Sequence, residues 1–205
     1  MEIVSVPMLD YGVANFVLPG QGESGDSHLV CCKKGGILVA AIDGVGHGQE
    51  AASAAEMSSA VLKESCDEQP ISLVEKCHVA LRGSRGVVLS LAFIDPKQGL
   101  MTWLGVGNVQ GVLMRAGALK GEGRELLLLR AGLVGSKLPS LQATVLRVAK
   151  GDTLFFATDG IRGDFVDSLT SKENPQHAAD RILQNYRTGS DDALVLTARL
   201  LEGRP

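Results

Sequence analysis

The stretch GILVAAIDGVGHGQE, residues 36–50, begins with an apolar run, followed by an aspartate, three closely spaced glycines and the start of a helix-forming segment. The apolar part has the length of a strand, and residues 49–65 are rich in alanine and other good helix formers. We therefore expect a strand over 36–43 and a helix over 49–65. Gly46 and Gly48 suit the backbone angles of the corner between them. A turn does not explain Asp43, which ends an otherwise apolar strand.

A glycine-rich loop after a strand invites comparison with nucleotide-binding loops. The dinucleotide fingerprint G-x-G-x-x-G fails here, because Gln49 stands where the third glycine is required. The Walker sequence G-K-[ST] is also missing. Asp43 lies where a pyrophosphate would enter, and its carboxylate would repel that group. The sequence therefore argues against a nucleotide site in this loop.

The remaining pattern predicts many strands and few helices. A second helix is expected over 71–83 and a third over 175–189, where Pro175 and Gly189 mark its two ends. Strands are expected over 28–32, 86–95, 99–107, 108–115, 125–132 and 193–201, with a strand–turn–strand unit over 144–160. The helices cluster instead of alternating with single strands. This order favours an α+β fold, with antiparallel sheets faced by helices, over a doubly wound parallel sheet.

Composition excludes several classes of protein. The net charge is −3, with the 20 basic residues scattered along the chain, so we expect no nucleic-acid partner. There is no apolar run long enough to span a membrane, and we expect no membrane association. The N-terminus, MEIVSVPMLDYG, lacks the basic and apolar regions of an export signal, which indicates a cytoplasmic protein. Without a C-x-x-C pair, the four cysteines are expected to be free thiols.

Acidic residues recur at the ends of apolar strands. Two Asp–Gly pairs follow such strands, and other aspartates directly precede strands; the residues are Asp43–Gly44, Asp159–Gly160, Asp26, Asp191 and Asp192. Strand ends of this kind can converge at one end of the sheets. Convergent aspartates raise one another's pKa and require a cation to remain ionised together. Hard divalent cations prefer carboxylate, carbonyl and water oxygens, so these residue types suit a metal cluster.

The motifs SGD, DGVGHG, TDGI and DDA, in this order, resemble the metal-dependent PPM/PP2C serine/threonine phosphatases, in particular their SpoIIE-like bacterial branch. The resemblance extends from about Gly22 to the end of the chain. The segments RGVVLSLAFID, GVGNVQGVL and AGLVGSK look most like the stressosome phosphatases of that branch. The resemblance implies a single phosphatase domain over 1–205. It also implies a PP2C-like sandwich of two antiparallel β-sheets flanked by α-helices, with two Mn²⁺ or Mg²⁺ ions at one end.

The resemblance also assigns the metal site. Asp43 matches the aspartate that bridges both metals, and Gly44 the glycine whose carbonyl binds one of them. Asp159 and Asp191 match the remaining metal aspartates. The resemblance implies that Asp43, Asp159 and Asp191 are catalytic. Asp26 matches an early aspartate of the metal site that tends to hold metal-bound water. Asp192 follows Asp191 where many relatives have Asn, and on a strand the two would face opposite ways.

Two features depart from the animal-type enzymes. No arginine precedes Arg82, so their phosphate-binding arginine near the N-terminus has no counterpart here. Val45 stands where they place a histidine, and His47 follows two residues later. Phosphate binding and protonation of the leaving group therefore remain unassigned.

The implied activity is hydrolysis of phosphoserine or phosphothreonine on phosphorylated regulatory proteins of the stressosome type. Two alternatives stay open. One is a non-catalytic regulator that keeps the fold and binds a phosphoprotein, although retention of all the metal aspartates argues against it. The other is a phosphatase of an anti-sigma-factor antagonist. The sequence hardly separates this activity from that of a phosphatase acting on stressosome-type regulators.

Overall fold

The computed structural model describes residues 8–33, 35–118 and 123–201. Residues 1–7, which begin the stretch on which the expectation about an export signal rests, lie outside the described part. Among the described residues, no helix combines the length and the apolar character needed to cross a membrane.

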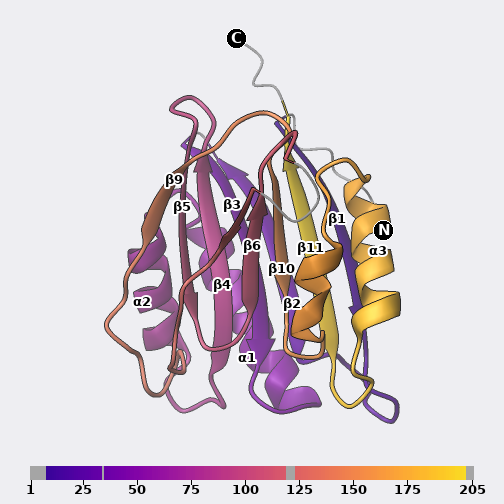
Figure 1. The fold of residues 1–205 in the computed structure, drawn as a ribbon. Coiled ribbons are helices and arrows are strands. Elements are labelled where there is room, and N and C mark those ends of the chain that lie inside the picture. Colours follow the sequence, from indigo (N-terminus) through magenta and orange to yellow (C-terminus); the bar gives the residue numbers. More distant parts are fainter. Residues whose placement is uncertain (1–7, 34, 119–122, 202–205) are drawn as a thin grey trace.

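The element order is strand-rich, as the sequence predicts (Figure 1). The helices are α1 (Gln49–Glu64), α2 (Pro70–Ala80) and α3 (Pro175–Tyr186), with a short 3₁₀ helix η1 (Gly163–Ser168). The strands are β1 (Leu9–Phe16), β2 (Asp26–Lys33), β3 (Gly36–Gly44), β4 (Val87–Asp95), β5 (Leu100–Val106), β6 (Gln110–Met114), β7 (Arg124–Leu126), β8 (Leu129–Arg130), β9 (Thr144–Arg147), β10 (Thr153–Ala157) and β11 (Ala193–Leu200).

The strands form two packed sheets with helices on the outer faces (Figure 1). One sheet has the order β1-β11-β10-β6-β7, and the other β2-β3-β4-β5-β8, with β9 also paired to β5. The helices α1 and α2 pack on the second sheet, and α3 and η1 on the first. The predicted α+β sandwich is confirmed. Among the described residues, its one departure from antiparallel pairing is the short parallel contact between β5 and β8.

The apolar run that begins the stretch 36–50 forms the strand β3, which is buried on both faces. Leu38, Ala40 and Ile42 pack into the cluster shared with the helices α1 and α2. The alternate residues Ile37, Val39 and Ala41 pack into the cluster between the two sheets. A strand buried on both faces carries no polar alternation, which is why this run is continuously apolar.

The predicted strand over 125–132 is wrong in one respect, because two short strands occupy this stretch. The strand β7 pairs with β6 in one sheet, and β8 pairs with β5 in the other. Between them the buried Leu127 donates its N–H to the Gly111 carbonyl at 2.8 Å. A side chain at Gly105 or Gly111 would collide with Leu127, so these glycines make room for the crossing from sheet to sheet.

The sequence did not predict the strand β1, which pairs with β11 along its whole length. Leu9, Tyr11 and Val13 pack between the sheets, whereas Ala14 and Phe16 on the other face pack into the cluster that includes α3, so both faces of the strand are partly apolar. The Gln176 side chain donates to the Val13 carbonyl at 2.8 Å and accepts from the Val13 N–H at 3.0 Å. Tertiary packing of this kind leaves little trace in the local sequence pattern.

The expectation of four free thiols is also wrong. Cys31 in β2 and Cys66, just after α1, form a disulfide between segments 35 residues apart. Cys32 is free and exposed, and Cys77 is free and buried. The sequence offers no close cysteine spacing for this pair, because the fold alone brings the end of α1 onto β2.

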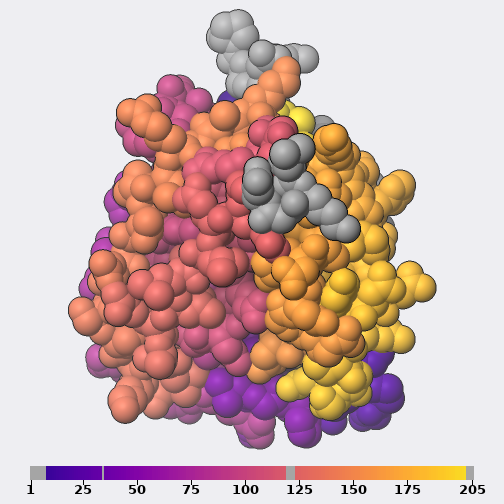
Figure 2. Space-filling view, in the orientation of Figure 1, coloured from indigo at the N-terminus to yellow at the C-terminus, as the bar shows by residue number. Residues whose placement is uncertain are grey.

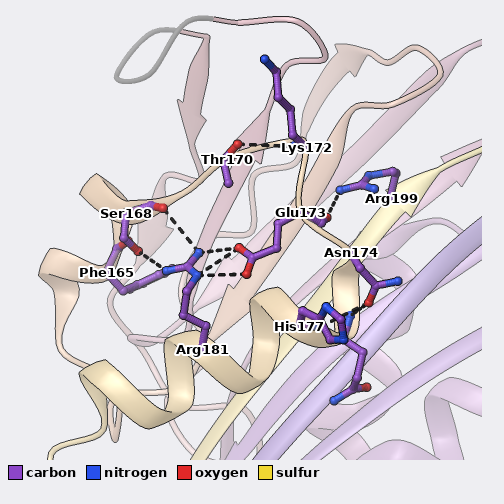
Figure 3. A network of polar contacts seen from close by, with 10 residues as sticks. Phe165, Ser168, Thr170, Lys172, Glu173, Asn174, His177, Arg181 and Arg199 are labelled. Atoms are coloured by element: carbon purple, nitrogen blue, oxygen red, sulfur yellow. Dashed lines mark hydrogen bonds and ion pairs between the residues drawn. The ribbon is translucent and has the colours of Figure 1, made fainter.

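Polar contacts connect α3 with residues 168–174, which precede it in the chain (Figure 3). Arg181 donates to both carboxylate oxygens of Glu173, at 3.0 and 3.2 Å from Nε, and to Ser168 Oγ at 3.1 Å. Asn174 caps the helix by accepting from the N–H groups of Gln176 and His177. The cap and the proline at the first helical position confirm the predicted start of this helix.

Candidate metal centre

The aspartates predicted from the sequence lie at one end of the sandwich, the lower end in Figure 1. Asp26 and Asp43 are directly opposite each other in the antiparallel pair β2–β3. Asp159 follows β10, and Asp191 precedes the neighbouring strand β11. In the space-filling view, the segments that carry these ends meet along the lower edge of the molecule (Figure 2).

A hydrogen-bonded threonine joins the two sheets at this end. Thr158, buried at the end of β10, donates its hydroxyl to Asp26 Oδ2 at 2.7 Å. The same hydroxyl accepts the N–H of Leu194 in β11 at 2.8 Å. Thr158 thus holds Asp26 of one sheet against the strand ends of the other.

The electrostatics show that the acids act on one another. Burial, and then the charges of Asp26, Asp159, Asp191 and Asp192, raise the pKa of Asp43 to about 8. Burial and the same kind of repulsion raise the pKa of Asp26 to about 7, although the Thr158 hydrogen bond opposes the shift. The protein itself does not compensate these negative charges, since none of the acids forms an ion pair within the described ranges.

Asp159 has its own polar partner. Asn108, in the β5–β6 turn, donates Nδ2–H to Asp159 Oδ2 at 2.8 Å. Burial and the charge of Asp191 raise the pKa of Asp159, and the Asn108 hydrogen bond acts against this rise. The turn between β5 and β6 therefore belongs to the site, which sequence reasoning missed.

The glycines of the two Asp–Gly pairs are required by close packing. A side chain at Gly44 would overlap the backbone of Ala51 in α1, and one at Gly160 would overlap the carbonyl oxygen of Asp192. Gly44 also donates its N–H to the Gly25 carbonyl at 2.9 Å. These approaches bring α1 next to Asp43, and Asp159 next to the start of β11.

Gly46 and Gly48 have the role expected of them. Their φ angles are +86° and +77°, in the left-handed region that favours glycine, and Gly48 is the N-cap of α1. The expectation that they turn the chain into the helix is confirmed. His47 between them is exposed and forms no hydrogen bond to another described residue.

Asp191 and Asp192 have different surroundings. The Asp192 carboxylate is almost fully buried and accepts the N–H groups of Leu18 and Gly25, each at 2.7 Å. It ties the loop before β2 to the start of β11. Asp191 is half-buried, and its charge acts on Asp159, Asp43 and Asp26. The sequence did not indicate this structural role of Asp192.

The donor set fits hard divalent cations that keep part of their hydration shell. Within the described part of the chain, no three His, Cys, Asp or Glu side chains are arranged to hold one ion by themselves. Mg²⁺ is usually bound by one or two carboxylates, with waters and substrate phosphate in its other positions. A site of paired carboxylates without histidine or cysteine matches this preference.

Comparison with known proteins shows the family and the fold. The chain matches the family described as Stage II sporulation protein E (SpoIIE) over residues 33–201. A curated relative, the phosphoserine phosphatase RsbX of Bacillus subtilis (strain 168), is 27% identical over 180 residues, which cover 86% of each chain.

Solved structures agree with this assignment. One, from work on the bacterial stressosome as a modular system, superposes with a TM-score of 0.83 at 29% identity and covers 93% of this chain and 99% of its own. RsbX in complex with magnesium superposes with a TM-score of 0.84 at 22% identity, covering 96% and 97% of the two chains. The PP2C phosphatase domain of SpoIIE from Bacillus subtilis gives a TM-score of 0.76 at 20% identity, covering 96% of this chain and 64% of that one. The resemblance drawn from the four motifs is thereby confirmed, and the chain belongs to the SpoIIE family, with the PP2C fold.

Proposed function

We propose that this protein is a metal-dependent serine/threonine protein phosphatase. The observation that carries the proposal is the convergence of Asp26, Asp43, Asp159 and Asp191 at one end of the sandwich. Membership of the SpoIIE family and similarity to a phosphoserine phosphatase support it. The solved structure of RsbX with magnesium supports a divalent cation as the cofactor.

We propose Asp43, Asp159 and Asp191 as the side chains that hold two Mn²⁺ or Mg²⁺ ions, with the Gly44 carbonyl as a further ligand. Such a pair of cations, when bound, acidifies water near neutral pH and offsets the charge of phosphoryl oxygens. Asp26 has its Oδ2 occupied by Thr158, which leaves Oδ1 to orient a water. Asn108 fixes Asp159 by holding one of its oxygens.

The proposed substrates are phosphorylated regulators of the stressosome type. The activity of the relative RsbX and the stressosome context of the related structure support this choice. A phosphatase of an anti-sigma-factor antagonist is the second candidate, because the acidic site would be the same for both substrates. We also propose a cytoplasmic location and one phosphatase domain over residues 1–205.

The experiment measures phosphate release from a phosphorylated candidate partner with Mn²⁺, for the wild type, Asp43→Asn and Asp164→Asn. Asp164 is an exposed acid outside the site and serves as a matched control. Asp43→Asn should lower activity at least about 100-fold, since even residues that only support metal ligands contribute ten- to 100-fold. Activity unchanged by Asp43→Asn would contradict the metal centre. A wild type that is inactive with every cation and partner would favour a non-catalytic, phosphoprotein-binding regulator.

A further inference from the structure

A cavity of about 500 Å³ lies beside the candidate metal centre. It is bounded by the first half of α1 and by the turn that leads into β4. Ala54 and Met57 of α1 contribute its apolar part, and Glu50, Ser84 and Arg85 its polar part. Its size is in the range of sites that accept a few side chains or a small ligand.

The turn that carries Arg85 lies next to the loop that follows Asp43. Val45 donates its N–H to the Gly86 carbonyl at 3.2 Å, and Gly44 is paired with Val87 in the sheet. A side chain at Gly46 would lie 2.7 Å from Nη1 of Arg85. The side chain of Arg85 thus lies against the loop three residues beyond Asp43.

Arg85 is the only basic residue that lines the cavity within the described part of the chain. Its Nε donates to Glu50 Oε2 at 2.5 Å, and the two side chains are 44% and 72% exposed. An exposed ion pair of this kind contributes at most about 1 kcal/mol, so another anion can replace Glu50 at low cost. In the described structure the guanidinium makes no ion pair with Asp26, Asp43, Asp159 or Asp191.

The turn that presents Arg85 is well ordered by its own hydrogen bonds. Ser84 Oγ donates to the Leu81 carbonyl at 2.7 Å and accepts the Gly86 N–H at 3.1 Å. The position of the guanidinium is thus set by a fixed backbone and by Glu50. Met57, which is flexible and 43% exposed, can adapt to different side chains on the other wall.

We propose that this cavity binds the polypeptide segment next to the phosphorylated residue, and that Arg85 pairs with an acidic side chain of that segment. Glu50 competes with the segment for the guanidinium. The inference rests on the proposed phosphatase function and adds a determinant of substrate choice. Glu50 and Arg85 give the described lining one charge of each sign, so an acidic neighbour of the phosphoserine is favoured where it takes the place of Glu50 at Arg85.

The experiment compares p-nitrophenyl phosphate, which has no polypeptide, with two phosphoserine peptides that carry either Glu or Lys beside the phosphoserine. Wild type with Mn²⁺ should prefer the Glu peptide. In Arg85→Ala, the ratio of kcat/KM for the Glu peptide to that for p-nitrophenyl phosphate should fall about threefold to fivefold, the size expected for an exposed ion pair of at most about 1 kcal/mol. The change should lie mainly in KM.

Two further variants sharpen the test. Glu50→Gln should raise the same ratio, because it frees the guanidinium, so the two variants move the ratio in opposite directions. Arg82→Ala removes an exposed arginine from the same turn and does not line the cavity, so it should leave the ratio unchanged. An equal loss on all substrates in Arg85→Ala would place Arg85 on the phosphoryl group and overturn the proposal. An unchanged ratio would overturn it as well.

Peptide binding separates this proposal from the phosphatase function. Fluorescence anisotropy of the labelled Glu phosphopeptide requires no turnover and can be measured on wild type and Arg85→Ala. Weaker binding by Arg85→Ala would support peptide binding in the cavity, even if the wild type releases no phosphate and the proposed activity fails. Equal binding by both proteins would overturn peptide binding in the cavity, whatever the activity.

Discussion

At the scale of single residues, neighbouring acids in this site have unlike tasks. Asp191 and Asp192 are adjacent in the chain. Of the two, only Asp192 accepts backbone N–H groups with both carboxylate oxygens, those of Leu18 and Gly25. A buried carboxylate that accepts two such bonds at 2.7 Å stabilises the fold, although its charge repels Asp26 and Asp43. The loop that leads to Asp26 depends on it.

Asp192→Ala should therefore lower the free energy of unfolding. Two lost bonds to a charged group cost about 1.5–3 kcal/mol each, and relief of repulsion returns part of this, which leaves a net loss of about 2 kcal/mol. Asp191→Ala is the matched control, with an expected loss under about 1 kcal/mol, since its carboxylate makes one local bond within the described residues. Urea denaturation at pH 7 measures both. A larger loss for Asp191→Ala than for Asp192→Ala would contradict the assignment.

The raised pKa values of Asp26 and Asp43 predict how stability depends on pH. Without divalent cations, the folded protein holds protons on these groups up to about pH 7 and 8, whereas the unfolded chain releases them near pH 4. At these two groups the folded state thus binds more protons between these limits, and their contribution to stability falls as pH rises from about 4 to 8. The melting temperature in EDTA should decrease over this range.

Added Mn²⁺ should remove most of that decrease, because it binds the ionised carboxylates of the folded state. Asp43→Asn should make the pH dependence in EDTA shallower. A melting temperature in EDTA that rises steadily from pH 5 to 8 would contradict the electrostatic account.

At the scale of elements, the sequence predicts strongly patterned segments well. The helices α1, α2 and α3 and the strands β3, β4 and β5 lie within a few residues of their expected bounds. The strand β1 and the crossing at Leu127 were missed, because they depend on contacts with α3 and with glycines of other strands. The local pattern of apolar residues indicates that a segment is buried, but it does not indicate which element packs against that segment.

The disulfide between β2 and the end of α1 belongs to this scale. Protein purified without reductant should show two thiols per chain in denaturant, those of Cys32 and Cys77. Reduction should lower the free energy of unfolding by about 4 kcal/mol, as expected for a loop of 35 residues. Cys32→Ser is the control and should leave this difference unchanged. Four thiols in the unreduced protein would contradict the bond.

At the scale of the whole molecule, the site is a product of topology. The sequence identifies five acids at strand ends, and the structure brings them together because β2 pairs with β3 in one sheet while β10 pairs with β11 in the other. The bond from Thr158 to Asp26 then joins the two sheets. Thr158, Asn108 and Asp192 could not be assigned from sequence, since their roles depend on register and on the packing of one sheet on the other.

The central claim is that these strand-end acids form a two-metal centre. The most direct measurement is anomalous scattering from crystals of the wild type grown with Mn²⁺. Two manganese peaks are expected at the end of the sandwich between Asp43, Asp159 and Asp191, and at least one peak should be lost in Asp43→Asn. Phosphatase activity in the same preparation, without a manganese peak beside Asp43, would contradict it.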